Sequence, residues 1–228
     1  MTNRFRQHFQ RSVAAKAARG APAGVGTLRD DSAYTLMLAQ LDDHRRALKA
    51  VESVERKATL KRQFLPAYDA WVDGVLAGGA GAQDDVLMTI MVWRIDGGDY
   101  QGALKIGAYA LQHGLTLPDQ FKRSTPCLLV EEFADAALRA SRAGESIQVE
   151  PLVEIGRLTA DADMPDEVRA KLNKAIGYGL TETDPPRALE HLRRALQLFA
   201  NVGVKKDIER LERELKNTAA GDQSGPGG

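Results

Sequence analysis

Four aspartates, Asp84, Asp85, Asp96 and Asp99, are the best candidates for metal chemistry in this sequence. Carboxylate oxygens are ligands that Mg²⁺ prefers. The two pairs flank a stretch with helical composition, which separates them by about 16 Å at 1.5 Å per residue. The ions of a two-metal site lie only about 3.5–4 Å apart. We therefore expect the aspartates to cap helices and keep the surface soluble, with metal binding as the alternative.

Basic side chains form two groups that could contact the phosphates of DNA. Residues 1–29 contain six basic residues and no acidic one, and the segment from Asp31 to about Arg62 has a local surplus of three positive charges. The first group is interpreted either as a disordered tail or as an arm that orders on DNA. The second group, from Asp31 to about Arg62, is interpreted as a solvated surface, as a DNA contact or as part of a coiled-coil seam between subunits. The candidate DNA-binding residues are Arg4, Arg6, Arg11, Lys16, Arg19, Arg45, Arg46, Lys49, Arg56, Lys57, Lys61 and Arg62.

Motifs for other chemistry are absent from the sequence. There is no G-x-x-x-x-G-K-[ST] nucleotide-binding loop, and Cys127 is the only cysteine, which excludes an intramolecular disulfide and zinc-type cysteine spacing. The four histidines are far apart. Pro165-Asp166 resembles the start of a nuclease motif, but Arg169 stands where the acid of acid-x-Lys is needed. We expect no cofactor, and Mg²⁺ only if the chain is itself an endonuclease.

Composition indicates a globular protein with a genuine core. The chain has 228 residues, 43% of them apolar, and a formal net charge of zero. No apolar run reaches the roughly 18 residues of a membrane span, and the N-terminus lacks the apolar segment of a signal peptide. The sequence therefore predicts neither membrane insertion nor secretion, and the single cysteine fits a reducing cytosol.

The stretch from Gly81 to Gly102 is the predicted packing centre. Its apolar residues leave almost no polar face, so we expect a helix enclosed on most sides. Gly97-Gly98 should end this helix, since glycine accepts the positive φ of many helix C-termini, and Asp99 should cap the next one. The periodicity elsewhere predicts an all-α protein of about nine helices. The expected parts are a flexible basic arm (1–30), a basic amphipathic helical region for DNA contact or oligomerisation (31–80), a helical-hairpin core (81–216) and a disordered tail (217–228).

A weak internal repeat supports stacked helical hairpins. The pattern D-x-x-x-A-L at Asp99 to Leu104 recurs at Asp184 to Leu189, and Ala-Leu follows each copy seven residues on. Small and large residues at helical spacing let helices approach closely, as in tetratricopeptide hairpins. The offset between the copies is not a multiple of 34, so we expect irregular hairpins that are tetratricopeptide-like towards the C-terminus.

Three longer stretches carry a family resemblance: GAQDDVLMTIMVWRIDGGDYQGAL, TADADMPDEVRAKLNKAIG and GVKKDIERLERELK. They resemble the small terminase subunit of cohesive-end tailed bacteriophages, also named the terminase endonuclease subunit. The resemblance runs from about Tyr34 to Lys216. It implies a DNA-packaging protein of the bacterial host cytoplasm that recognises the cohesive-end site of double-stranded viral DNA, forms homo-oligomers, and brings genome ends to a large terminase subunit with the ATPase.

The family name also implies endonuclease activity, which leaves two functions open. In the first, the chain is a recognition and assembly subunit, and its large partner cuts the DNA. In the second, Asp84, Asp85, Asp96 or Asp99 holds Mg²⁺ and this chain makes the staggered cut itself. Because no catalytic motif is identifiable, we favour the first.

Overall fold

The computed structural model describes residues 32–118 and 121–222, together with residues 8, 11–13 and 15 near the N-terminus. Within this part of the chain there are ten α-helices, one short 3-10 helix and no strand, which confirms the predicted all-α class. The chain has two compact units, unit 1, Met1–Thr125, and unit 2, Pro126–Gly228. The expected flexible arm lies almost wholly outside the described residues.

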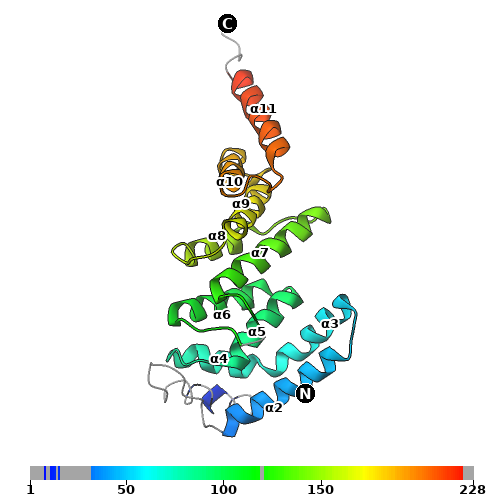
Figure 1. Ribbon diagram of the computed structural model, residues 1–228, viewed down its shortest axis with the longest axis vertical. Helices are drawn as coiled ribbons and strands as arrows, with labels where there is room; N and C mark the ends of the chain where they lie inside the picture. The colour runs from blue at the N-terminus through cyan, green and yellow to red at the C-terminus, as the bar shows by residue number, and fades with distance from the viewer. Residues whose placement is uncertain (1–7, 9–10, 14, 16–31, 119–120, 223–228) are drawn as a thin grey trace. The chain divides into compact units, whose positions relative to one another are not determined.

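Between residues 32 and 118, unit 1 forms five α-helices and the 3-10 helix η1. Figure 1 shows their arrangement. Their bounds are α2 Ser32–Lys49, α3 Val54–Phe64, η1 Leu65–Ala67, α4 Asp69–Gly78, α5 Asp85–Gly97 and α6 Tyr100–His113. The region we expected as one long helix or a hairpin is a hairpin, α2–α3. Pro66 lies in η1, where the first turn needs no N–H donor from it.

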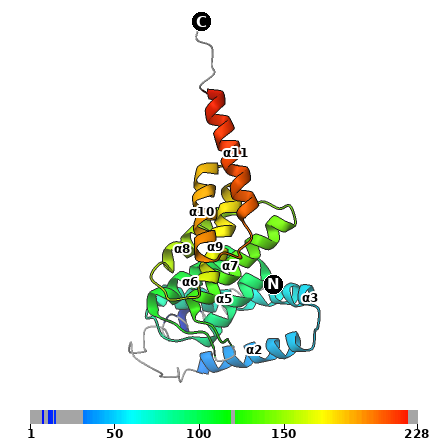
Figure 2. The same ribbon diagram turned by 45° about the horizontal axis from the view of Figure 1, so that its top comes forward.

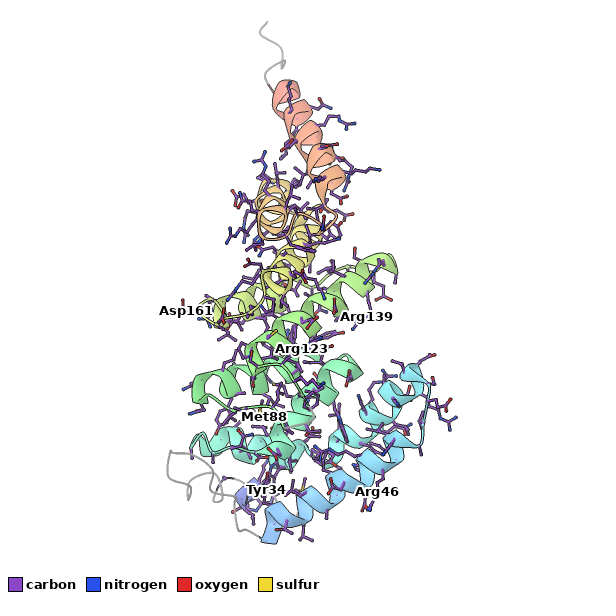
Figure 3. The ribbon with its side chains drawn as sticks, viewed as in Figure 1. Tyr34, Arg46, Met88, Arg123, Arg139 and Asp161 are labelled. Carbon is purple, nitrogen blue, oxygen red and sulfur yellow. The ribbon has the colours of Figure 1, made fainter. Side chains whose placement is uncertain are left out.

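Helix α5 is the packing centre of unit 1, as predicted. It packs against α2, α3, α4, α6 and η1, and Figure 3 shows Met88 of α5 among these helices. Five of its side chains are completely buried: Val86, Leu87, Met88, Ile90 and Met91. Burial of one such side chain contributes roughly 1.5–3 kcal/mol, so α5 is a major source of stability.

The ends of α5 follow the predicted capping chemistry. Asp84 is the N-cap, and its Oδ1 accepts a hydrogen bond from the Leu87 N–H at 2.9 Å. The helix ends at Gly97, and Gly98 has a φ of 83°, a value that glycine adopts without a Cβ clash. Asp99 then caps α6 by accepting from the Gly102 N–H at 2.9 Å.

The apolar seam of α2 is buried within unit 1. Tyr34, Met37, Leu41 and Leu48 are each less than a tenth exposed, and α2 contacts α3 and α5. These residues were one candidate for a coiled-coil seam between subunits. Because they already pack inside their own chain, this seam is not a free surface for a second copy.

Unit 2 consists of five helices, which Figure 2 shows from a second direction. Their bounds are α7 Thr125–Arg142, whose first residue belongs to unit 1, α8 Val149–Leu158, α9 Asp166–Leu180, α10 Pro185–Leu198 and α11 Lys205–Asp222. Helix α11 continues through residues 217–222, which we had expected to be disordered. Ile208 and Leu211 of α11 are buried, and α11 packs on α10.

Helices α9 and α10 form a close hairpin. A Cβ at Gly177 would lie 2.7 Å from Cδ2 of Leu192, so only glycine fits without movement of its neighbour. Asp184 caps α10 by accepting from the Arg187 N–H at 3.2 Å, just as Asp99 caps α6. The first alanine of each repeat copy, Ala103 or Ala188, is completely buried. The repeat therefore marks two capped hairpin helices, while the tetratricopeptide likeness stays a prediction.

Candidate nucleic-acid interface

The second helix of the α2–α3 hairpin is exposed or half-buried along its whole length. Residues 50–53 connect the helices, and the Ser53 hydroxyl caps α3 by accepting from the Arg56 N–H at 3.2 Å. No residue of α3 is buried, and Val54 at its start is 82% exposed. The hairpin therefore has a surface that its own fold does not cover.

Aromatic rings hold the hairpin to the rest of unit 1. The rings of His44 on α2 and Phe64 on α3 stack with centroids 3.9 Å apart, and His44 Nδ1 lies 2.8 Å from the Tyr68 hydroxyl. Tyr68 is completely buried and meets Trp93 of α5 edge to face. Burial lowers the pKa of His44, against the opposing effect of Asp43, and raises the pKa of Tyr68 to about 12. His44 thus belongs to the interior of the hairpin.

Five predicted DNA-binding residues lie at the solvent-facing surface of the hairpin. The side chain of Arg46 is 77% exposed and pairs with Asp43 one turn away, a type of surface contact that contributes little to stability. Lys49 and Arg56 are exposed and form no ion pair with any described residue. Lys57 is half-buried, and the exposed Arg62 donates to Thr59 Oγ1 at 2.9 Å. These five are called the hairpin cations: Arg46, Lys49, Arg56, Lys57 and Arg62.

Two other predicted DNA-binding residues are tied to α5 instead. Arg45 donates from Nη2 to Thr89 Oγ1 at 2.9 Å, and its side chain is 30% exposed. Lys61 pairs with Asp96, and its side chain is 18% exposed. These contacts join residues that are 35 or more positions apart in the sequence. No local pattern could have separated them from the hairpin cations.

Of the predicted basic arm, only Arg11 is described. Its exposed guanidinium pairs with Asp73 on α4. Arg4, Arg6, Lys16 and Arg19 lie outside the described residues, so their assignment to DNA stays a prediction.

Each of the four candidate catalytic aspartates has a structural partner. Asp84 is completely buried and accepts from Trp71 Nε1 at 3.0 Å as well as from Leu87 N–H. Asp99 caps α6 and pairs with Arg94. The remaining two are at opposite ends of α5, where Gln83 Nε2 donates to Asp85 Oδ1 at 3.2 Å and Lys61 pairs with Asp96.

This arrangement does not fit one Mg²⁺ site. The aspartates lie at the two ends of α5, and the carboxylates of Asp84 and Asp99 each accept two hydrogen bonds from protein groups. In the part of the chain that the structure describes, no three His, Cys, Asp or Glu side chains are grouped so that they could hold a metal ion. We derive no catalytic step through these residues.

A family model matches more than half of the chain. The model described as phage small terminase subunit matches residues 38–167, which include most of α2 and all of α3 to α8. The chain belongs to the phage small terminase subunit family. Its role is therefore in phage DNA packaging.

Two relatives of this small terminase subunit carry terminase names. The chain is 51% identical over 217 residues to "Terminase, endonuclease subunit" of Escherichia phage P2, an alignment that covers 95% of this chain and 87% of the relative. It is 23% identical over 201 residues to "Probable terminase, endonuclease subunit" of Haemophilus phage HP1, covering 82% and 72%. No solved structure matches the chain. Among the described helices, none has both the length and the apolar character of a membrane span.

Proposed function

We propose that this small terminase subunit binds the cohesive-end region of viral DNA and delivers it to the large terminase subunit, which holds the ATPase and nuclease. The setting is the cytoplasm of the bacterial host. The hairpin cations, four of them exposed and one half-buried, are the observation that carries this proposal. Charges left in water can pair with phosphates without first breaking a buried contact, and they release counterions from the DNA when they do so.

Unequal charge on the α2–α3 hairpin supports DNA as its partner. Residues 32–64 contain seven basic and four acidic side chains. Two of the acids, Asp42 and Asp43, pair with Arg45 and Arg46 within α2. Because phosphate contacts position a protein on DNA and base contacts provide specificity, these cations account for affinity. Base readout of the cohesive-end site requires further contacts.

A salt titration tests this proposal. The triple variant Arg46→Ala, Lys49→Ala, Arg56→Ala is compared with wild type on a duplex that contains the cohesive-end site. The slope of log Kobs against log salt is negative, and each lost phosphate contact should make it shallower by about 0.9. For three lost contacts we expect the magnitude of the slope to fall by about 2–3. Circular dichroism should show unchanged folding, because the three side chains are exposed.

A matched control removes the same number of charges elsewhere. Arg157, Arg193 and Arg210 are exposed on unit 2 and pair with Glu154, Glu212 and Asp207. Their triple alanine variant should keep the wild-type slope. If the hairpin variant also keeps that slope, the hairpin does not contact DNA phosphates.

Both relatives are named as endonuclease subunits of a terminase, which favours a second candidate function, a metal-dependent endonuclease. Under this alternative the purified chain cuts cohesive-end DNA in Mg²⁺ without the large subunit. Asp85→Asn and Asp96→Asn are the informative variants, because neither residue is a helix cap. Cleavage by the wild-type chain that both changes abolish would establish this alternative.

The proposal also includes association of several copies of the chain. The surface for it must lie outside the buried seam of α2. Light scattering of the purified protein, with and without DNA, measures the number of subunits. A mass that stays at one chain at all concentrations would exclude self-association.

A further inference from the structure

Unit 2 has a group of cations that the proposed function does not use. Residues 126–228 contain 14 basic and 18 acidic side chains, so the unit as a whole is acidic. Five basic residues nevertheless lie in the last turn of α7, in α9 and in the first turn of α11. Lys174 of α9 connects them, because it bonds to the Val202 carbonyl shortly before α11 and is influenced by the charge of Arg142 at the end of α7. We call them the basic edge: Arg139, Arg142, Lys174, Lys205 and Lys206.

Lys174 is the inner residue of the basic edge. Its Nζ donates to the Val202 carbonyl at 2.8 Å and lies 5.4 Å from the centroid of the Tyr178 ring. No described carboxylate forms an ion pair with it. Burial lowers the pKa of Lys174, and the nearby charge of Arg142 acts in the same direction while Asp207 opposes both. Lys174 is thus a half-buried ammonium with Arg142 and Asp207 nearby and no direct ion pair, so a further anion would stabilise its charged form.

Lys205 and Lys206 occupy a position that their own helix disfavours. Both are exposed in the first turn of α11, an 18-residue helix whose N-terminal end carries a partial positive charge. Asp207 follows them, but its carboxylate accepts a hydrogen bond from the Tyr178 hydroxyl at 2.9 Å. Helix stability therefore does not explain these two lysines, whereas a phosphate near them would interact favourably with both the charges and the first-turn N–H groups.

Arg139 and Arg142 extend the basic edge along the last turn of α7. There the helix dipole favours cations, but neither arginine forms an ion pair with a described residue. Arg142 Nε donates only to the Leu138 carbonyl at 3.0 Å. Of the other exposed arginines of unit 2, Arg157, Arg193 and Arg210 each have an acidic partner, whereas Arg194 and Arg213 have none among the described residues. Figure 3 shows Arg139 and the acidic residue Asp161 at opposite sides of unit 2.

We propose that the basic edge is a second phosphate-contact surface for DNA on this chain. The cations are spread over three helices instead of enclosing one pocket, which suits consecutive phosphates of a backbone. This inference rests on the proposed DNA-binding function, and it assigns part of the binding energy to unit 2. Sequence patterns pointed to the N-terminal half only, because α7, α9 and α11 contribute one or two cations each.

The test uses the full chain and a duplex with the cohesive-end site. The edge variant Arg142→Ala, Lys205→Ala, Lys206→Ala removes three exposed charges and leaves Lys174 in place. We expect the magnitude of the negative slope of log Kobs against log salt to fall by about 2–3, at about 0.9 per lost contact. The circular dichroism spectrum should not change. The control Arg157→Ala, Arg193→Ala, Arg210→Ala should keep the wild-type slope.

Measuring the hairpin variant alongside separates the two proposals. If only the hairpin variant has a shallower slope, the hairpin contacts DNA and the proposed contact by the basic edge is rejected. If only the edge variant has a shallower slope, the basic edge contacts DNA and the proposed contact by the hairpin is rejected. If the edge variant instead changes the mass in light scattering and keeps the salt slope, the edge is a contact between subunits and the DNA assignment is overturned.

Discussion

The α2–α3 and α5–α6 hairpins of unit 1 differ in whether their charged side chains bond to the protein or remain at its surface. In α5–α6, the charged groups Asp84, Arg94 and Asp99 bond to neighbouring side chains and main-chain groups. In α2–α3, the hairpin cations remain at the surface, and α3 has no buried residue. The difference indicates that the aspartates stabilise the fold, while the hairpin cations have at most exposed contacts within one turn and can meet a partner.

Burial explains why the two hairpins differ. A charged group inside a protein is tolerated only with partners, because its desolvation is costly. Asp84, the completely buried N-cap of α5, therefore needs the hydrogen bonds that it accepts. The hairpin cations are solvated and can lie close together without such bonds. Variants that disturb one hairpin at a time can test this separation.

The largest expected effect is on stability and follows from Met88→Ala in α5. Met88 is completely buried, and a buried Met→Ala change lowers the free energy of unfolding by about 2–5 kcal/mol. Leu60→Ala in the half-buried face of α3 should cost clearly less. Urea denaturation of both variants measures the difference. Equal losses would mean that α3 contributes to the core as much as α5 does.

Asp84→Ala should have the next largest effect. The change leaves Trp71 Nε1 and the Leu87 N–H without this acceptor, and a buried donor left unsatisfied costs about 1–3 kcal/mol. Asp85→Ala, on a half-buried neighbour, is the control and should cost less. If Asp84→Ala keeps wild-type stability, the buried carboxylate is retained for another purpose and the catalytic alternative gains support.

The helix caps should give a smaller effect that is similar in the two units. Asp99→Ala removes the cap of α6, and Asp184→Ala removes that of α10, so each should lower the free energy of unfolding by about 1 kcal/mol. Asp99 also pairs with Arg94, which has a second partner in Asp69. A much larger loss at Asp99 would show that the ion pair, not the cap, dominates there.

The pH dependence of stability should show the smallest effect. Burial lowers the pKa of His44 below its ordinary value of 6.5, so the unfolded chain binds the proton more tightly than the folded one. Stability should then fall as the pH drops through 6.5, while Tyr68, with a pKa of about 12, keeps its proton. His44→Gln should lose less stability between pH 7 and pH 5 than wild type. An equal loss would mean that His44 does not titrate differently on folding.

Local sequence patterns predicted the α5–α6 hairpin well. The apolar run after Asp85 required enclosure, Gly98 provided the positive φ at the end of α5, and Asp99 lay where a cap was needed. Each of these features depends on residues within about one turn of one another. The repeat at Asp99 and Asp184 was informative for the same reason, since it reflects a cap and a buried alanine.

Long-range contacts limited what could be predicted about the candidate site. Arg45 and Lys61 looked like surface cations until the fold brought them to Thr89 and Asp96. Helix periodicity could not show that Asp84 would bond the Trp71 indole, because this contact depends on the packing of α4 against α5. The basic edge of unit 2 was missed because its cations come from three separate helices.

The most direct test of the central claim measures binding and cleavage together. Purified wild-type protein, the hairpin variant and the Asp85→Asn, Asp96→Asn double variant are each incubated with cohesive-end DNA and Mg²⁺, with and without the large terminase subunit. We predict that the hairpin variant binds DNA more weakly, that the aspartate variant binds like wild type, and that cleavage requires the large subunit. Cleavage by wild-type protein alone that the aspartate changes abolish would contradict this account.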